Sequence, residues 1–470
     1  MSENKIANID EIPALTNCEF MDFSHNAIES LPEDIDKMKS LLKLDVSHNN
    51  ISHLPENIGR VRSLKRLIFS HNKVQLMPET LGDDQILLHI DGSDNALEAV
   101  PHDMRKLRNL EVLLLGNNQL SAIPKSFDAL YTLHNLDVHG NQLSSLQIPK
   151  TVKSLDLSNN PLHTPLDDHR GSVYLHIGDD NHGRCLTTLS MANLQLDEVP
   201  SALGNLKLLT KLDLSDNNIR EVPDKLLKIK PLQHVNLSSN QLSALPDNID
   251  AWVALKYLDV GNNGISEFTM SMTKLPSLQF LNISNNQLET LPENFGELNQ
   301  LVTMNLSQNE LLTFPNDRID VLASLLDLDV SKNHIDAFPI DFPYLYRVST
   351  VVASSNDITA LPSDIAKMKS LTKLDLSDNI IENLPEGLAK LPSIKSLDVS
   401  DNKIMQFPNS FETLREKADV KFDEQSSYKS REQRQRQPES PEPSPATPAK
   451  SKKGKKGRPG SQSSTSAATK

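Results

Sequence analysis

The sequence has little glycine, few aromatic residues and almost no cysteine. Glycine supplies 16 of 470 residues, about half its usual share, and aromatic residues supply 4%. So little glycine excludes collagen-like and glycine-rich linker proteins and argues against a glycine-rich nucleotide-binding loop. The two cysteines, Cys18 and Cys185, are too few for the stapled ends common in secreted proteins built from repeats. We therefore expect a reducing compartment.

Long apolar runs are also missing. No stretch approaches the ~18 consecutive apolar residues that a membrane-spanning helix needs, so we expect no membrane span. The opening residues, Met1 to Lys5, do not lead into the apolar region of a secretory signal, so we expect no export. On these grounds we expect a cytoplasmic protein, with the nucleus as a second location.

Charge is divided unevenly along the chain. The net charge is −14, yet residues 425–470 contain eleven Lys or Arg and three Glu, which gives them +8 and leaves −22 for the rest. This tail is rich in Ser, Pro, Gln, Lys and Gly, a composition that predicts disorder. Its basic run could be a nuclear-import signal, an anion-binding patch or a solubilising segment. The run consists of Lys450, Lys452, Lys453, Lys455, Lys456 and Arg458.

A repeated unit, mostly of 23 residues, dominates the remainder. It reads Leu41-x-x-Leu44-x-Val46-x-x-Asn49-x-Ile51-x-x-Leu54-Pro55 in one of its copies. The Asn recurs at positions 26, 49, 72, 95, 118, 141, 160, 217, 240, 263, 286, 309, 333, 356, 379 and 402. A further unit between 160 and 217 has Leu194 at the Asn position, which makes seventeen units.

Each unit predicts one strand and one return segment. The apolar spacing turns side chains inward on a short strand, and the Asn can satisfy backbone groups where the strand turns away. One unit cannot bury its apolar face alone, so neighbouring units must stack. We therefore predict an arc with a parallel sheet on its concave side and short helical or irregular returns on its convex side.

On these motifs, the chain resembles the leucine-rich repeat family over residues 18–410. The 23-residue unit that ends in Leu-Pro is similar to that of the Ras-group repeat proteins, the class that contains the repeat regions of Scribble and Erbin. The resemblance implies an α/β leucine-rich repeat solenoid. It also implies a role in intracellular signalling assembly, with a small GTPase or a phosphatase as a partner.

The pattern divides the chain into six parts. They are an N-terminal half-repeat cap (1–17), repeats 1–7 (18–165), an insertion (166–185), repeats 8–17 (186–410), a C-terminal cap (411–424) and the basic tail (425–470). Because Leu194 replaces Asn directly after the insertion, the ladder of Asn side chains should break there. In the C-terminal cap, Val420-Lys421-Phe422 is loosely similar to the Val-x-Phe docking motif for type 1 protein phosphatase, but a capping strand explains the same residues.

No recognised catalytic motif is present. The sequence has no P-loop, no Gly-x-Ser-x-Gly, no His-Glu-x-x-His, no kinase signature and no Cys-x-x-Cys. We therefore expect a monomeric, non-catalytic scaffold for protein partners that uses no cofactor and no metal. The alternative is a nuclear or chromatin-associated acidic repeat chaperone, although such proteins carry an acidic tail where this chain has a basic one.

Two groups of residues invite a metal-binding interpretation. His25, His48 and His71 occupy one position in three successive units, about 4.8 Å apart once strands stack. Residues of a solvent-facing turn are the simpler interpretation. The insertion collects potential ligands without a recognised spacing, and a solvated loop is the simpler interpretation there. These residues are Asp167, Asp168, His169, Asp179, Asp180, His182 and Cys185.

Outward positions on the predicted strands indicate where a partner would bind. Between the second and third strand leucines, ten of seventeen residues are Asp and none is basic, so this face should repel nucleic acid. Apolar residues interrupt the acidic ladder in two places, and exposed aromatic residues inside a polar rim are typical of binding hot spots. The predicted protein-binding residues are Phe20, Leu42, Ile68, Leu88, Val112, Leu114, Asp213, Tyr257, Asp259 and Phe280.

Overall fold

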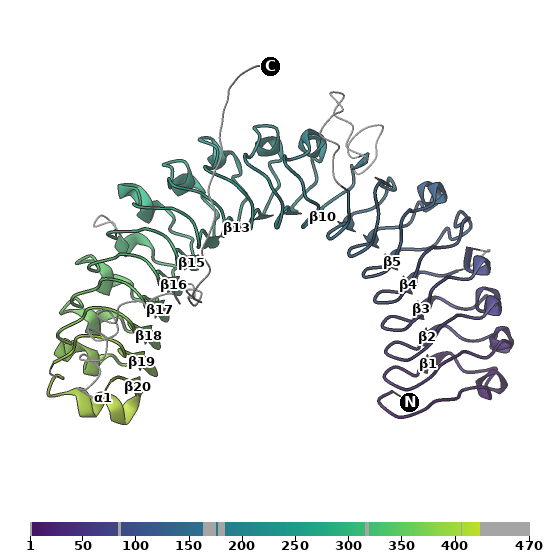
Figure 1. The fold of residues 1–470 in the computed structure, drawn as a ribbon, viewed down its shortest axis with the longest axis horizontal. Coiled ribbons are helices and arrows are strands. Elements are labelled where there is room, and N and C mark those ends of the chain that lie inside the picture. The colour runs from purple at the N-terminus through teal and green to yellow at the C-terminus, as the bar shows by residue number, and fades with distance from the viewer. Residues whose placement is uncertain are drawn as a thin grey trace, which may run out of the picture. The chain divides into compact units, whose positions relative to one another are not determined.

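Stacked coils, each with one strand and one return segment, build the described part of the chain. The computed structural model describes residues 2–82, 86–162, 175–176, 184–314, 319–405 and 407–423. In these residues, eighteen short strands form one parallel sheet. The sheet lines the inner side of the coils, and the returns, many with a turn of 3-10 helix, line the outer side (Figure 1). This arrangement confirms the predicted repeat solenoid.

The strands of the main sheet are three residues long. They are β1 Phe20–Asp22, β2 Lys43–Asp45, β3 Arg66–Ile68, β4 His89–Asp91, β5 Val112–Leu114, β6 Asn135–Asp137, β8 Ser154–Asp156, β10 Thr188–Ser190, β11 Lys211–Asp213, β12 His234–Asn236, β13 Tyr257–Asp259, β14 Phe280–Asn282, β15 Thr303–Asn305, β16 Asp327–Asp329, β17 Thr350–Val352, β18 Lys373–Asp375, β19 Ser396–Asp398 and β20 Asp419–Lys421.

The helices of the returns are three to five residues long. They are η1 Ile12–Ala14, η2 Ile35–Lys37, η3 Glu56–Arg60, η4 Glu79–Gly82, η5 Lys125–Ala129, η6 Ser201–Asn205, η7 Leu226–Lys228, η8 Ile249–Ala251, η9 Met272–Lys274, η10 Glu293–Glu297, η11 Ile319–Val321, η12 Phe342–Tyr344, η13 Ile365–Lys367 and η14 Glu386–Lys390. One α-helix, α1 Phe411–Lys417, follows them. Even α1 has only seven residues, so no helix in the described ranges could cross a bilayer.

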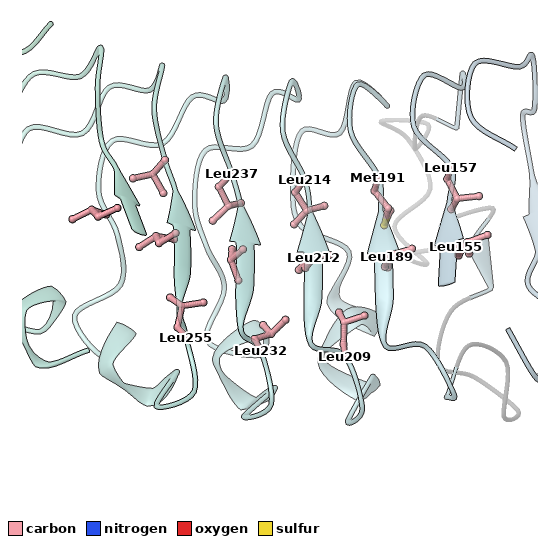
Figure 2. Close-up of a cluster of buried hydrophobic side chains, with 14 of the residues drawn as sticks. Leu155, Leu157, Leu189, Met191, Leu209, Leu212, Leu214, Leu232, Leu237 and Leu255 are labelled. Atoms are coloured by element: carbon pink, nitrogen blue, oxygen red, sulfur yellow. The ribbon is translucent and has the colours of Figure 1, made fainter. Parts of the chain in front are cut away.

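The core is a continuous column of inward-facing apolar side chains. The central residue of each strand faces it, and successive central residues, such as Leu189 and Leu212, are paired in register. Figure 2 shows Leu189, Met191, Leu212 and Leu214 pointing to the same side of the sheet. Because each coil contacts mainly its two neighbours, the apolar face of one coil is covered by the next.

The repeated Asn side chain ties each coil to the one before it. Asn240 is buried, and its Nδ2 donates hydrogen bonds to the carbonyl oxygens of Leu237 (3.0 Å) and of Leu214 in the preceding coil (2.9 Å). Its Oδ1 accepts a hydrogen bond from the backbone N–H of Ile219 at 3.0 Å. One amide therefore satisfies backbone groups in two coils, and these groups would otherwise be buried without partners.

At the insertion, the Asn ladder loses a rung but the sheet does not break. Leu194 is fully buried at the Asn position. Strand β8 nevertheless pairs directly with β10, with Leu155 opposite Leu189. On the return side, a second sheet of two strands joins β7 Leu146–Gln147 to β9 Leu175–His176, so two residues of the insertion are paired with the seventh coil.

The C-terminal end of the array closes with α1 and β20. Lys417, the last residue of α1, is exposed, and its Nζ donates to the carbonyl oxygens of Ala389 (2.6 Å) and Leu391 (2.5 Å). The Phe422 ring packs edge-on against Phe407 and Phe411, with centroids 5.3 Å away in both cases. The Val-x-Phe segment therefore contributes its Phe to the packing of this end.

We predict that Asn263→Ala lowers the free energy of unfolding by about 1–3 kcal/mol, because it leaves backbone groups of two coils without partners. Asn263 donates to the carbonyl oxygens of Leu237 and Val260 and accepts from the N–H of Leu242. Urea unfolding followed by circular dichroism measures the change. Asn248→Ala is the control, since Asn248 is exposed and makes no capping hydrogen bond. Equal stability of the two variants would contradict the prediction.

Candidate binding face

The first and third residues of each strand form the inner face. In β13, Tyr257 and Asp259 are half-buried, whereas Leu258 between them is fully buried. Parallel pairing keeps equivalent residues in line, so that Tyr257 lies opposite Phe280 and Asp259 opposite Asn282. We call the line of first residues the first column and the line of third residues the second column. A partner on this face would contact both columns.

Carboxylates of the second column hold the turns that follow the strands. Asp213 Oδ1 accepts hydrogen bonds from the N–H of Ser215 (2.9 Å) and from its hydroxyl (2.7 Å). The same bond between Asp and the Ser hydroxyl recurs at Asp22, Asp45, Asp329, Asp375 and Asp398. At Asp22, hydrogen bonds from the hydroxyl and backbone N–H of Ser24 lower the pKa of the carboxyl. The acidic ladder is therefore part of the structure as well as a source of negative charge.

An aromatic pair stands in the first column. The Tyr257 and Phe280 rings are stacked, with centroids 4.3 Å apart and an angle of 6° between their planes. The sequence predicts this pair, because both residues share one outward position. His234, the preceding residue of the column, extends the row with its ring 6.0 Å from that of Tyr257. His234 was not among the predicted binding residues, although its spacing of 23 from Tyr257 was a signal for it.

Asp259 connects the aromatic pair to the second column. Its Oδ2 accepts a hydrogen bond from the Tyr257 hydroxyl at 3.3 Å, and its Oδ1 accepts one from Asn282 Nδ2 at 2.9 Å. Burial, together with the charge of Asp259, raises the pKa of Tyr257 to about 12. The phenol therefore stays protonated at neutral pH and keeps its hydrogen bond, which holds the ring in place.

The apolar residues predicted in repeats 1–5 do not form one patch. In the first column, Lys43, Arg66 and His89 separate Phe20 from Val112. In the second column, Asp91 separates Ile68 from Leu114. Leu42 and Leu88 each precede a strand and have Lys65 between them along the sheet. Phe20, on the first strand, is 66% exposed, whereas the other five side chains are partly buried.

Comparisons with known proteins agree with this architecture. One family model described as leucine rich repeat matches residues 207–265, 230–288, 253–311 and 347–404. A second model of the same description matches residues 40–61. The chain is a leucine-rich repeat protein. No curated protein matches the sequence, so the likeness rests on the repeat unit and on solved structures.

Among the solved structures that resemble this leucine-rich repeat protein are three at 25% or 26% identity. A leucine-rich repeat protein of Leptospira interrogans is 25% identical, with a TM-score of 0.61 over 89% of this chain and 100% of its own. The ectodomain of the Arabidopsis thaliana receptor kinase GASSHO1/SCHENGEN3, solved with CASPARIAN STRIP INTEGRITY FACTOR 2, is 25% identical, with a TM-score of 0.61 over 88% and 54%. The Arabidopsis receptor kinase HAESA, solved with the peptide hormone IDA and the co-receptor SERK1, is 26% identical, with a TM-score of 0.61 over 87% and 74%.

Three histidines stack at one turn position of the first leucine-rich repeats. The rings of His25 and His48 have centroids 4.0 Å apart, and those of His48 and His71 are 4.1 Å apart. The planes are nearly parallel, so the nitrogen lone pairs, which lie in those planes, do not converge on one point. All three side chains are exposed, and the backbone at each residue has a positive φ near +50°. The arrangement fits the solvent-facing turn better than a shared metal ion.

Another group of possible metal ligands lies at the ends of the neighbouring strands β6 and β8, in the sixth and seventh repeats. Asp137, His139 and Asp156 have ligand atoms within 4.8 Å of one another, which makes them the one such group in the described residues. His139 Nδ1 lies 2.6 Å from Asp137 Oδ1, where other repeats place a Ser hydroxyl. A cation there would have to displace the proton that this contact shares. The signal in the sequence was His139 at a position usually held by Ser.

Some predicted residues lie outside the described ranges. These are the six basic residues of the tail and, within the insertion, Asp167, Asp168, His169, Asp179, Asp180 and His182. Cys185 is described, partly buried and not in a disulfide. The predicted binding residues on the inner face of the repeats, by contrast, all lie within the described ranges.

We predict that protonation of His48, the middle residue of the histidine stack, destabilises the first repeats. Burial, and then the charges of His71 and His25, lower the pKa of His48, so a proton binds more tightly to the unfolded chain. The contribution of His48 to stability should be complete above about pH 6.5 and lost as the pH falls below it. His48→Asn should weaken this acid dependence, because Asn occupies the same left-handed position at Asn117 and Asn262.

Urea midpoints at about pH 7.5 and about pH 5.5 measure this effect across the titration range of histidine. His53→Asn is the control, since His53 is exposed and is not part of the stack. An acid dependence that is the same in His48→Asn and in the control would contradict the prediction.

Proposed function

We propose that this protein is a non-catalytic scaffold that binds protein partners through its concave face. The observation that carries the proposal is the stacked pair of Tyr257 and Phe280 in the first column. Partly exposed aromatic rings in a polar surround are favoured at the centre of protein interfaces, because they bury a large area and lose little conformational freedom. Neither ring is among the buried residues of the apolar core.

Two features of the surroundings support an interface at this position. Lys256, Gln279, Asp259 and Asn282 surround the pair and supply a polar rim. The hydrogen bond from Tyr257 to Asp259 holds one ring in its orientation before any partner arrives. A ring that is already ordered loses less entropy on binding than a free one.

The relatives support protein or peptide ligands in a general sense. Leucine-rich repeat folds are generally used for protein binding, and the structures of HAESA and GASSHO1/SCHENGEN3 each contain a further protein or peptide. We extend this use to the present chain. The Ras-group likeness of its 23-residue unit leads us to propose a cytoplasmic role in signalling, with a small GTPase or a phosphatase as the partner. Phe422 is packed against Phe407 and Phe411, so the Val-x-Phe segment is poorly available for docking. We therefore propose that a phosphatase would bind the concave face.

We predict that the double change Tyr257→Ala and Phe280→Ala weakens partner binding by about 2 kcal/mol or more, as the loss of hot-spot residues does. The measurement is a quantitative pull-down from cell extract, followed by titration of the captured partner. Folding should survive, because no inward-facing residue changes, and circular dichroism checks it.

The matched control is Thr350→Ala with Ser396→Ala, two partly buried residues of the same column on β17 and β19. This pair should bind almost as the unmodified protein does. If the aromatic double variant keeps the full set of partners, the binding face lies elsewhere on the protein.

A further inference from the structure

The first column changes character from one end to the other between β11 and β16. Parallel pairing places its residues in a single row. The row runs Lys211, His234, Tyr257, Phe280, Thr303 and Asp327. One end of this row is basic, its centre is aromatic and its other end is acidic. We call this row the strip.

Positive charge at the first end has no ion-pair partner among the described residues. Lys211 and Lys256 are exposed, and neither forms an ion pair with any described residue. By contrast, Lys43 at the same column position in β2 pairs with Asp45 at 3.2 Å. The pKa of His234 is lowered by burial and then by the charges of Lys211 and Lys256, which places both lysines close to its ring. An anionic group here would meet two cations without competition.

Negative charge gathers at the opposite end. Both outward residues of β16, Asp327 and Asp329, are acidic. Asp329 is bonded to Ser331 in the usual turn, but Asp327 accepts only a long hydrogen bond, 3.4 Å from the Ser349 hydroxyl, among the described contacts. Neither carboxylate forms an ion pair with a described residue. Asp327 is therefore available to a cation from a partner.

Amide groups beside the strip suit a peptide backbone. In the second column, the side-chain oxygens of Asn236 and Asn305 accept hydrogen bonds from Ser238 and Ser307. Their Nδ2 groups donate to no described atom, and both residues hold the third, outward position of their strands. Donors of this kind, a few strands apart, can bind carbonyl oxygens of an extended chain that crosses the strands.

The length of the strip indicates how long an extended peptide on it would be. Neighbouring strands lie about 4.8 Å apart, so the five steps from Lys211 to Asp327 span about 24 Å. An extended chain advances about 3.3 Å per residue, which makes the strip about seven residue steps long. The aromatic pair lies about halfway along it.

We propose that the strip binds an extended peptide segment of a protein partner that has an acidic side chain at one end, an apolar or aromatic side chain near its centre and a basic side chain at the other end. This inference rests on the proposed function, because it describes the partner of the same face. It adds that the charged side chains at the two ends of the bound segment must differ in sign and lie about seven residues apart. Complementary charge at both ends would fix the register of the segment on the strip.

Four pools of eight-residue peptides test the proposal with the full chain. Every pool has Trp at position 4, Glu or Lys fixed at positions 1 and 8, and random residues elsewhere. Retention on the immobilised protein is measured by mass spectrometry. We expect one mixed-charge pool to be retained at least about fivefold better than the Glu–Glu and Lys–Lys pools, which corresponds to about 1 kcal/mol.

Charge-reversed variants separate this inference from a purely apolar contact. Lys211→Glu with Lys256→Glu should move the preference to the Lys–Lys pool, and Asp327→Lys should move it to the Glu–Glu pool. Pools that are retained equally, or a preference that the reversals leave unchanged, would overturn the inference. So would the failure of all pools to bind.

Any of these failures leaves the proposed function standing if the pull-down still depends on Tyr257 and Phe280. Conversely, if the pull-down is unchanged in Tyr257→Ala with Phe280→Ala, the proposed function fails first, whatever the pools show.

Discussion

Burial of backbone groups at the end of each strand is the constraint on which the rest of the structure depends. A strand of three residues that turns away immediately leaves N–H and C=O groups inside the stack, where water cannot reach them. The repeated Asn supplies the missing partners, as Asn240 does for Leu214, Leu237 and Ile219. Because the amide contacts the preceding coil, it links neighbouring repeats in addition to its own turn. The regular spacing of this residue accompanies the register of the sheet, although β10 stays in register where Leu194 takes the place of the Asn.

That register gives the concave face its properties. Each outward side chain lies beside the equivalent side chain of the next coil. Two outward residues 23 positions apart are therefore neighbours wherever the repeat has its usual length. The stack of His25, His48 and His71 and the pair of Tyr257 and Phe280 arise in this way. The repeat thus turns a one-dimensional spacing into a surface, and the sequence along one column describes that surface.

The same reasoning explains how much could be predicted from the sequence. The parallel sheet, its inward residues and the adjacency of Tyr257 to Phe280 follow from spacing alone. The bond between Asp213 and Ser215 does not, because it depends on the orientation of two short side chains after the strand ends. The continuity of the sheet from β8 to β10 was also not predictable, since the length of an insertion does not reveal whether the flanking strands pair. The scattered apolar residues of repeats 1–5 were grouped by type, whereas their separation by charged neighbours depends on the column that each one occupies.

The two columns differ in their freedom to vary, and this difference bears on where specificity is encoded. A carboxylate in the second column, such as Asp213, holds a turn, so replacing it changes the structure and the surface charge together. Residues of the first column, such as Lys211 and Phe280, support no turn and line no core. They can be exchanged at little cost in stability, as expected for surface positions without structural partners. The charges of the second column are therefore constrained mainly by folding, whereas residues of the first column are free to be adapted to a partner. The change from Lys211 to Asp327 across β11 to β16 lies in this freer column, and the proposed binding of a peptide segment would account for it.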